Sequence, residues 1–338
     1  MLAGRLAGRA ARLAVLLAAV AVACFALMEA SPVDPVDAYV GAEAARIGPE
    51  QRALIAERFG LDDPPLVRFG LWAGRVVRGD LGTSMIFNAP VTQVIASRFA
   101  ASLALMASAW LLSGALGFGL GILAALTRRS ALDRAIRVGA YTLASAPTFW
   151  VGLLLLTVFA VTLGWAPVCC ATDIGSDPAT ASLGERLRHL ALPAATLSIA
   201  GVAPIALHTR AQAVSILDSD FVTFARAQGE RGGGLVRHRV LRNAAVPAVL
   251  LQFASLSELF GGSVLAETVF SYPGLGQATV QAGLRGDVPL LLGIALFTTV
   301  FVFTGNLLGD TTHHLLDPRL RSTSRRRAGR SRAVEVHT

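Results

Sequence analysis

The chain has 338 residues, of which 54% are apolar and only 15% are charged, and its formal net charge is +8 at pH 7. A soluble domain of this length carries about a quarter charged residues, so the composition excludes an ordinary soluble protein and indicates a membrane protein. All 30 basic residues are arginine. The phosphate-binding loop GxxxxGK[ST] needs a lysine to reach the nucleotide, so this chain cannot contain one.

Six windows are long and apolar enough to form membrane helices, because about 20 apolar residues cross the hydrocarbon core of a bilayer. The first is short and follows a basic start, and the fifth is interrupted only by Glu258. In chain order the windows cover residues 13–28, 99–127, 138–172, 189–209, 243–266 and 288–309. We therefore expect an all-α membrane protein with six transmembrane helices.

The first window also resembles a signal peptide, since a basic segment precedes a short apolar run. The residues Ala21–Cys24 even resemble a weak lipidation site. No small-x-small cleavage site ends the run, so an uncleaved first helix is the better interpretation.

The region after the first helix differs in composition from the rest of the chain. Residues 31–97 hold eight of the 22 acidic residues, turn signals at Asp62–Pro65 and a helical pattern from Pro49 to Phe59. We predict a small extracytoplasmic cap here. The remaining domains are then a cytoplasmic N-terminus with the first helix (1–30), a five-helix core (98–318) and a basic cytoplasmic tail (319–338).

Arginines accumulate on the cytoplasmic side of multi-pass membrane proteins. Twenty of them fall in segments 5–12, 128–137, 210–242 and 319–332, whereas the short loops on the other side hold three. This asymmetry predicts that both termini are cytoplasmic. The absence of lysine and the abundance of alanine suggest a bacterial genome, and hence the bacterial cytoplasmic (inner) membrane. The basic charge then contacts anionic lipid, and no nucleic acid is needed to explain it.

The loop 213–242 contains a short predicted helix. Ser219 and Asp220 are good N-terminal caps, and Gly229 is a favoured terminator after Gln228. A helix of two turns, about 12 Å long, is marginal alone in water.

One face of this short helix is aromatic. Phe221, Phe224 and Ala225 recur at i, i+3 and i+4 and so share a face, while Arg226 points elsewhere. The face can be buried in the groove of a partner or can lie on lipid headgroups, and the spacing alone does not choose between them.

The segments Phe221–Gly229 and Arg237–Pro247 resemble the cytoplasmic coupling loop of binding-protein-dependent ABC importer permeases. The oligopeptide, dipeptide and nickel branch is the most similar, because Gly229 and Pro247 lie 18 residues apart, as the loop glycine and the proline of the fifth span do there. Five further segments resemble the family in order: Ser31–Asp37, Arg78–Ser84, Pro147–Gly152, Gly261–Gly276 and Leu316–Arg319.

The resemblance implies a transport subunit and not an enzyme. It would form half of the pathway for short peptides, with ABC ATPase subunits, a second homologous permease and an extracytoplasmic binding protein as partners. No cofactor or metal is expected in this chain, since ATP and Mg belong to the ATPase subunits. The short helix would dock on an ATPase subunit and transmit closure of the nucleotide dimer to the spans. The implied contact residues are Phe221, Phe224, Ala225, Arg226, Ala227 and Gly229.

The chain departs from the family at three places in this loop. Phe221 replaces the usual tyrosine, and Gln228 stands where lysine is frequent. The run Gly232–Gly234 is unusual and should loosen the second half of the loop.

Two carboxylates of the core are candidates for function. Glu258 lies inside a predicted span, where charged groups usually face a water-filled path or a partner. We predict that it lines the translocation path and attracts a cationic amino terminus; the alternative is a pair with a polar group of the companion permease. Glu267 is interpreted as structural or gating.

The outer loop holds a weaker candidate. Cys169, Cys170 and His189 could bind nickel or zinc, but their spacing supports no site, and adjacent cysteines rarely form a disulfide with each other.

Other functions remain open at this level. The alternatives are a nickel or metal-chelate importer and, from a different class, an ion-coupled secondary transporter. A membrane-embedded enzyme ranks last, because no HExxH, GxSxG or paired intramembrane aspartate motif is present.

Overall fold

The computed structural model describes residues 2–30, 35–40, 47–59, 62–173, 175 and 180–316. The predicted tail 319–338 lies outside these residues. The chain divides into two compact units. Unit 1 comprises Met1–Leu105, Leu163–Leu190 and Ser263–Phe303, and unit 2 comprises Met106–Thr162, Ala191–Gly262 and Thr304–Thr338.

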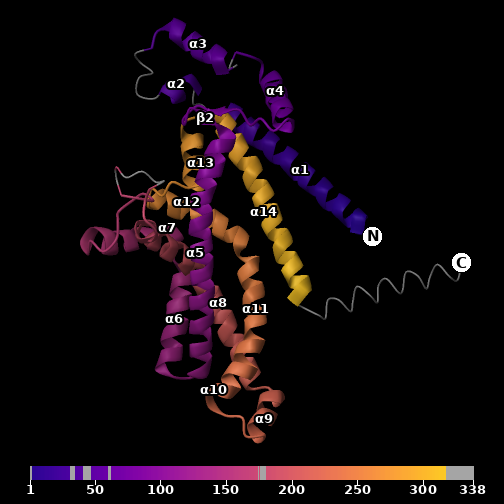
Figure 1. Cartoon of the computed structure of the whole chain (residues 1–338), viewed down its shortest axis with the longest axis vertical. Helices are drawn as coiled ribbons and strands as arrows, with labels where there is room; N and C mark the ends of the chain where they lie inside the picture. Colours follow the sequence, from indigo (N-terminus) through magenta and orange to yellow (C-terminus); the bar gives the residue numbers. More distant parts are fainter. Residues whose placement is uncertain are drawn as a thin grey trace, which may run out of the picture. The chain divides into compact units, whose positions relative to one another are not determined.

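Unit 1 begins with a long helix and the short elements of the predicted cap (Figure 1). They are α1 (Leu2–Glu29), α2 (Pro35–Val40), α3 (Pro49–Phe59), α4 (Pro65–Val77) and the hairpin strands β1 (Thr83–Ser84) and β2 (Ala89–Pro90). The helical pattern expected from Pro49 to Phe59 is confirmed by α3. The unit also holds α13 (Leu275–Leu284) and most of α14 (Val288–Leu316).

The hairpin of unit 1 is fixed by a buried carboxylate. The Ser84 hydroxyl and the Ile86 amide donate to one oxygen of Asp287, at 2.6 and 3.0 Å, and the Leu290 amide donates to the other at 3.1 Å. Asp287 is fully buried. A buried charge needs several hydrogen bonds to offset its desolvation, and this one ties the hairpin to the first turn of α14.

Unit 2 contains the helices that surround the short loop helix. Its elements are α6 (Ala131–Ser145), α7 (Thr148–Leu155), η2 (Leu156–Thr162), α9 (Asp220–Ala227), α10 (Gly232–Leu235), η3 (Val236–Leu241) and α11 (Arg242–Ala254), with parts of α5 (Val91–Leu126), α8 (Leu183–Leu217) and α12 (Leu256–Val269). Figure 1 shows α9 and α10 at the ends of α8 and α11.

Small residues let α5 and α8 pack closely within unit 2. A Cβ at Gly121 would lie 2.6 Å from the carbonyl oxygen of Ala206, and one at Gly117 would lie 2.8 Å from the side chain of Ile205. The two glycines are four residues apart, the spacing that brings membrane helices into backbone contact. This contact holds together the ends of the two helices that precede the loops of the functional site.

Four helices of the described chain are long and apolar enough to cross a membrane, or up to six if each of two bent pairs is one span. The window 138–172 does not form one continuous helix, because α6 and the pair α7–η2 meet at 108°. Proline disfavours helical backbone in the residue before it, and Ala146, which precedes Pro147, is extended with ψ 132. The window 243–266 is likewise broken, at Ser255 between α11 and α12.

The helix expected to begin at residue 99 begins earlier, at Val91. It includes Arg98, whose guanidinium lies 4.8 Å from the ring centre of Phe87. A charge-free window finds the apolar part of a helix, not its end, so the boundary at 97 between cap and core falls inside α5.

Candidate functional site

One face of α9 is buried in the core of unit 2. Val222 and Ala225 are 0% and 2% exposed. They pack in a cluster with Ile122 of α5, Ala213 of α8 and Ala244 of α11. Three residues apart on a helix, Val222 and Ala225 point the same way. Tertiary packing therefore supplies the stability that a two-turn helix lacks by itself.

The other face of α9 carries aromatic side chains. Phe221 is 41% exposed and Phe224 is 65% exposed, and Ala227 is exposed beside them. Ala225, one turn after Phe221, is buried against the chain's own helices and is not exposed with the two rings. The period of a helix shows which residues share a face, but the surrounding packing decides which arc is buried.

Gly229 ends α9 as predicted. Its φ is +93, in the left-handed region that favours glycine. Its amide donates to the carbonyl of Arg226, and the Glu230 amide donates to that of Ala225, each at 3.0 Å. These two bonds form a Schellman motif.

At the other end of α9, Ser219 takes the N-cap position with extended backbone. Its hydroxyl does not cap the helix, because it donates to the carbonyl of Ile216 at 2.6 Å. The side-chain cap expected at this residue is therefore absent, while the helix still begins at the next residue, Asp220.

Glu230, placed by that turn, holds an arginine against the aromatic face. The Arg239 Nε donates to Glu230 at 3.0 Å, and a second guanidinium nitrogen donates to the other carboxylate oxygen at 2.5 Å. The same guanidinium lies 5.5 Å from the ring centre of Phe221, within the range of a cation–π contact. The hydrogen bond from Arg239 lowers the pKa of Glu230. Glu230 and Arg239 thus fix the position of one exposed aromatic ring.

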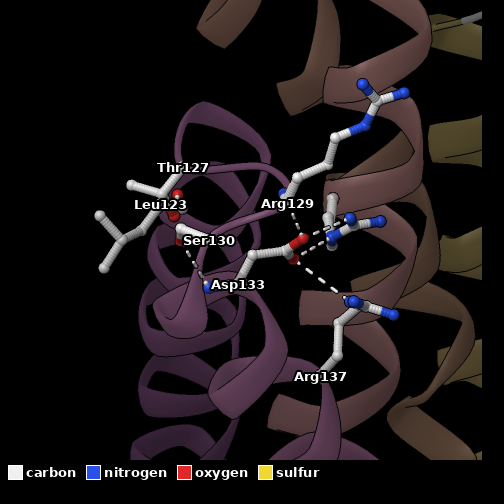
Figure 2. Close-up of polar contacts among 7 residues, drawn as sticks. Leu123, Thr127, Arg129, Ser130, Asp133 and Arg137 are labelled. Carbon is white, nitrogen blue, oxygen red and sulfur yellow. Dashed lines mark hydrogen bonds and ion pairs between the residues drawn. The ribbon is translucent and has the colours of Figure 1, made fainter.

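A buried carboxylate fastens the turn between α5 and α6. Asp133 is 1% exposed and accepts from the Arg129 amide at 3.1 Å and from Arg137 at 3.3 Å (Figure 2). Arg210 of α8 donates to both of its oxygens, at 2.6 and 2.8 Å. A bidentate pair of this kind is strong and directional. It ties the turn to α8, seven residues before α8 ends at Leu217.

A second, exposed ion pair lies near the end of α8. Arg128 contacts both carboxylate oxygens of Asp218 at 2.7 and 2.8 Å. Arg128 and Asp218 also line an open groove, together with Arg226. Arg226 therefore lies beside the turn after α5.

The two candidate carboxylates of the core differ in environment. Glu258 is exposed in the first turn of α12. Glu267 is fully buried. It accepts from the Ser102 hydroxyl at 2.6 Å and from the Gln277 amide at 3.1 Å. Because the Ser102 oxygen also accepts from the Leu275 amide at 2.7 Å, Glu267 anchors the start of α13, in keeping with its structural interpretation.

The outer-loop cysteines form a disulfide with each other, contrary to the expectation from their adjacency. Their thiols are therefore not free to bind a metal. Both nitrogens of the His189 ring have partners, the Cys169 carbonyl at 2.9 Å and the Asp173 carboxylate at 3.1 Å. The Cys170 amide donates to the carbonyl of Phe270 at 3.1 Å, so these contacts order the loop.

Unit 2 thus holds a short helix with Val222 and Ala225 in its own core and two aromatic side chains exposed. The family model for the inner membrane component of binding-protein-dependent transport systems matches residues 117–322, which include all of this site. This chain belongs to that family.

Curated relatives of the family cover nearly the whole chain. The oligopeptide transport system permease protein AppB of Bacillus subtilis is 30% identical over 306 residues, covering 90% of this chain and 95% of the relative. The di/tripeptide transport system permease protein DppB of Pseudomonas aeruginosa is 33% identical over 312 residues, covering 88% and 92%.

A solved structure shows the same fold. The MetNI methionine ABC transporter in its inward-facing conformations includes a chain that aligns with a TM-score of 0.54 at 18% identity, covering 67% of this chain and 97% of that one. The family's subunits are inner membrane transport components, which agrees with the membrane helices expected from the apolar windows.

Sequence reasoning missed the ionic anchors of this site. Asp133 had a readable signal, because it is the lone acidic residue among the arginines of segment 128–137. The pairing of Glu230 with Arg239 had none, since a nine-residue separation fits no local helical contact. The proposed contacts of Phe221, Phe224, Arg226, Ala227 and Gly229 with an ATPase remain predictions.

Proposed function

We propose that this chain is a six-span permease subunit of an ATP-driven importer, forming half of the pathway for short peptides. The single observation that carries the coupling part is the exposed aromatic face of α9, next to the buried side chains of Val222 and Ala225. The peptide cargo is supported by the relatives AppB and DppB, which are permease proteins of an oligopeptide and a di/tripeptide transport system. The partners are two ABC ATPase subunits, a second permease and an extracytoplasmic binding protein, and both termini are cytoplasmic.

Phe221 and Phe224 are the proposed anchors for the ATPase subunit. Exposed aromatic side chains are costly in water and dominate the energy of interfaces when a partner buries them. Arg239 and Glu230 hold one ring in position before binding, so little side-chain entropy is lost on docking. Ala227 and Gly229 leave room beside the rings for close approach.

The test is co-purification of the ATPase subunits with the full complex, followed by peptide-stimulated ATP hydrolysis. Phe221→Ala and Phe224→Ala should each weaken association about tenfold or more, the effect of removing an interface anchor. Thr223→Ala, exposed on the same helix, is the matched control and should retain association. If both phenylalanine variants bind the ATPase normally and couple hydrolysis to uptake, α9 is not the contact.

Glu258 is proposed to line the translocation path. Its carboxylate is exposed at the start of α12, where it can attract the cationic amino terminus of a peptide. Glu258→Gln should reduce peptide uptake while ATPase association stays normal. Unchanged uptake by this variant would remove the residue from the path.

A further inference from the structure

A pocket of about 110 Å³ lies in unit 1 where the helix α4 meets two membrane helices. Phe25 of α1 and Val288 of α14 belong to its apolar wall. Its charged part consists of Asp63, which precedes α4, and of Arg68 and Arg75 on α4. An apolar wall next to charged side chains suits an amphipathic ligand.

The pocket lies at the level of the membrane surface. The apolar span of α1 covers Ala7–Leu27, and that of α14 begins at Val288. Phe25 is thus close to the end of one span, and Val288 is the first residue of the other. Because both spans reach the pocket with their ends, it lies where the hydrocarbon core gives way to the headgroups.

The helix α4, which borders the pocket, has both a buried and an exposed apolar part. Trp72 is 6% exposed and packs with Ala21 of α1 and Leu292 of α14. Leu66 and Leu71 are 85% and 58% exposed, and Leu71 also lines the pocket. A helix that lies in the headgroup layer buries such leucines at the acyl boundary, whereas water would leave them exposed. The exposed leucines and the level of the pocket therefore both indicate lipid beside α4.

The pocket holds one negative and one positive side chain that do not pair with each other. Arg68 is engaged, because it donates to Glu29 at the end of α1 and lies 5.9 Å from the ring centre of Phe25. Asp63 and Arg75 are exposed, and within the described part of the chain neither has an opposite charge at ion-pair distance. Two opposite charges that share a pocket without pairing complement a zwitterion whose own charges are separated.

We propose that this pocket binds the headgroup of a zwitterionic phospholipid, phosphatidylethanolamine, from the leaflet that α4 faces. Arg75 binds the phosphate, since a guanidinium matches its oxygens, and Asp63 accepts from the ammonium. The acyl chains run along α1 and α14, past Phe25 and Val288. The inference rests on the proposed function only for the side of the membrane, which is extracytoplasmic.

The experiment titrates the detergent-purified full complex with fluorescent phosphatidylethanolamine, and in parallel with phosphatidylcholine and phosphatidylglycerol of the same acyl chains. Phosphatidylcholine should bind more weakly, because its quaternary ammonium has no N–H to donate to Asp63. Arg75→Gln should weaken phosphatidylethanolamine binding about fivefold, the contribution of one arginine near a membrane surface. Asp63→Asn should weaken it by about two- to fivefold, the range of an exposed charge pair.

Phosphatidylglycerol distinguishes the two variants, because it has the phosphate and no ammonium. Arg75→Gln should weaken its binding as well, whereas Asp63→Asn should not. The matched controls are Arg78→Gln, at the end of the same helix, and Asp62→Asn, next to Asp63; both residues are exposed and lie outside the pocket. Both controls should bind all three lipids as the original chain does.

Four outcomes would overturn the inference. The first is unchanged phosphatidylethanolamine binding in the double variant of Asp63→Asn and Arg75→Gln, and the second is an equal loss in the control variants. The third is equal binding of phosphatidylethanolamine and phosphatidylcholine by the original chain, which would show that the headgroup is not recognised. The fourth is complete displacement of the lipid by free phosphoethanolamine or by a short peptide, which would make a soluble zwitterion the ligand.

ATPase co-purification and peptide uptake, measured on the same samples, separate this inference from the proposed function. If the original complex takes up peptides and shows none of this lipid selectivity, only the lipid inference fails. If the original chain binds no ATPase, the proposed function fails, and the lipid titration still decides the pocket. The melting temperature of each variant checks its fold, which substitution of these exposed side chains should not affect.

Discussion

Replacing Asp133 with asparagine separates the contribution of a buried ion pair from that of an exposed one. Asp218 is the matched control, because it is also an aspartate held through both oxygens by an arginine. The Asp133 side chain is 1% exposed and that of its partner Arg210 is 23% exposed, whereas Asp218 and Arg128 are 54% and 43% exposed. Burial is therefore the main difference between the two pairs.

The expected cost follows from that burial. Removing one partner of a buried pair costs about 3–5 kcal/mol, because the other charge stays desolvated. Arg210 keeps some contact with water, so we expect about 2–3 kcal/mol for Asp133→Asn. The exposed pair should contribute at most about 0.5 kcal/mol, so Asp218→Asn should be nearly neutral.

The assay is thermal unfolding of the purified complex, followed by tryptophan fluorescence. For a unit of this size each kcal/mol shifts the melting temperature by about 2–4 °C. Asp133→Asn should lower it by roughly 4–12 °C, and Asp218→Asn by less than about 2 °C. Adding Arg210→Gln to Asp133→Asn should recover part of the loss, because the unpaired charge is removed. Equal shifts for the two aspartates would refute the reasoning from burial.

For three further substitutions, the structure gives the direction of the expected change in stability. Glu267→Gln puts a donor where the carboxylate now accepts from Ser102 and a backbone amide. It should therefore destabilise the chain by about 1–3 kcal/mol in the same melting assay. The same change at Glu258, which is exposed, is the control and should leave the stability unchanged. Gly229→Ala forces φ +93 on a residue with a Cβ, which should cost about 1–2 kcal/mol, and an ATPase association equal to that of the original chain would argue against a role for this turn. The pKa of Glu230 is lowered in the folded chain by Arg239, so its stabilising contribution is present above the ordinary glutamate range and is lost as the pH falls through the folded pKa; melting temperatures measured against pH should show this loss, and Glu230→Gln should flatten that part of the profile.

Local chemistry allowed some features to be predicted from the sequence. The bounds of α3 and the end of α9 at Gly229 follow from the preferences of single residues, and the structure agrees with both. The apolar windows located the membrane segments because hydropathy does not depend on tertiary structure. They could not show the 108° bend at Pro147, since an apolar window has no directional information.

Features that depend on distant residues could not be predicted in the same way. The buried arc of α9 is chosen by side chains of α5, α8 and α11, so the pattern alone could not show that Ala225 is buried. The pairing of Asp133 with Arg210 joins residues 77 apart. A carboxylate among arginines indicates that a pair will form, but only the fold chooses which arginine.

The burial of Val222 and Ala225 has a mechanical consequence. Protein interiors are close-packed and nearly incompressible. Both side chains are buried and pack against residues of α5, α8 and α11, so neither has free space to move into. A displacement imposed on the aromatic face therefore cannot be absorbed within α9 itself. The helix is packed rigidly against its neighbours, so a movement applied to its outer face reaches the ends of α5, α8 and α11 together.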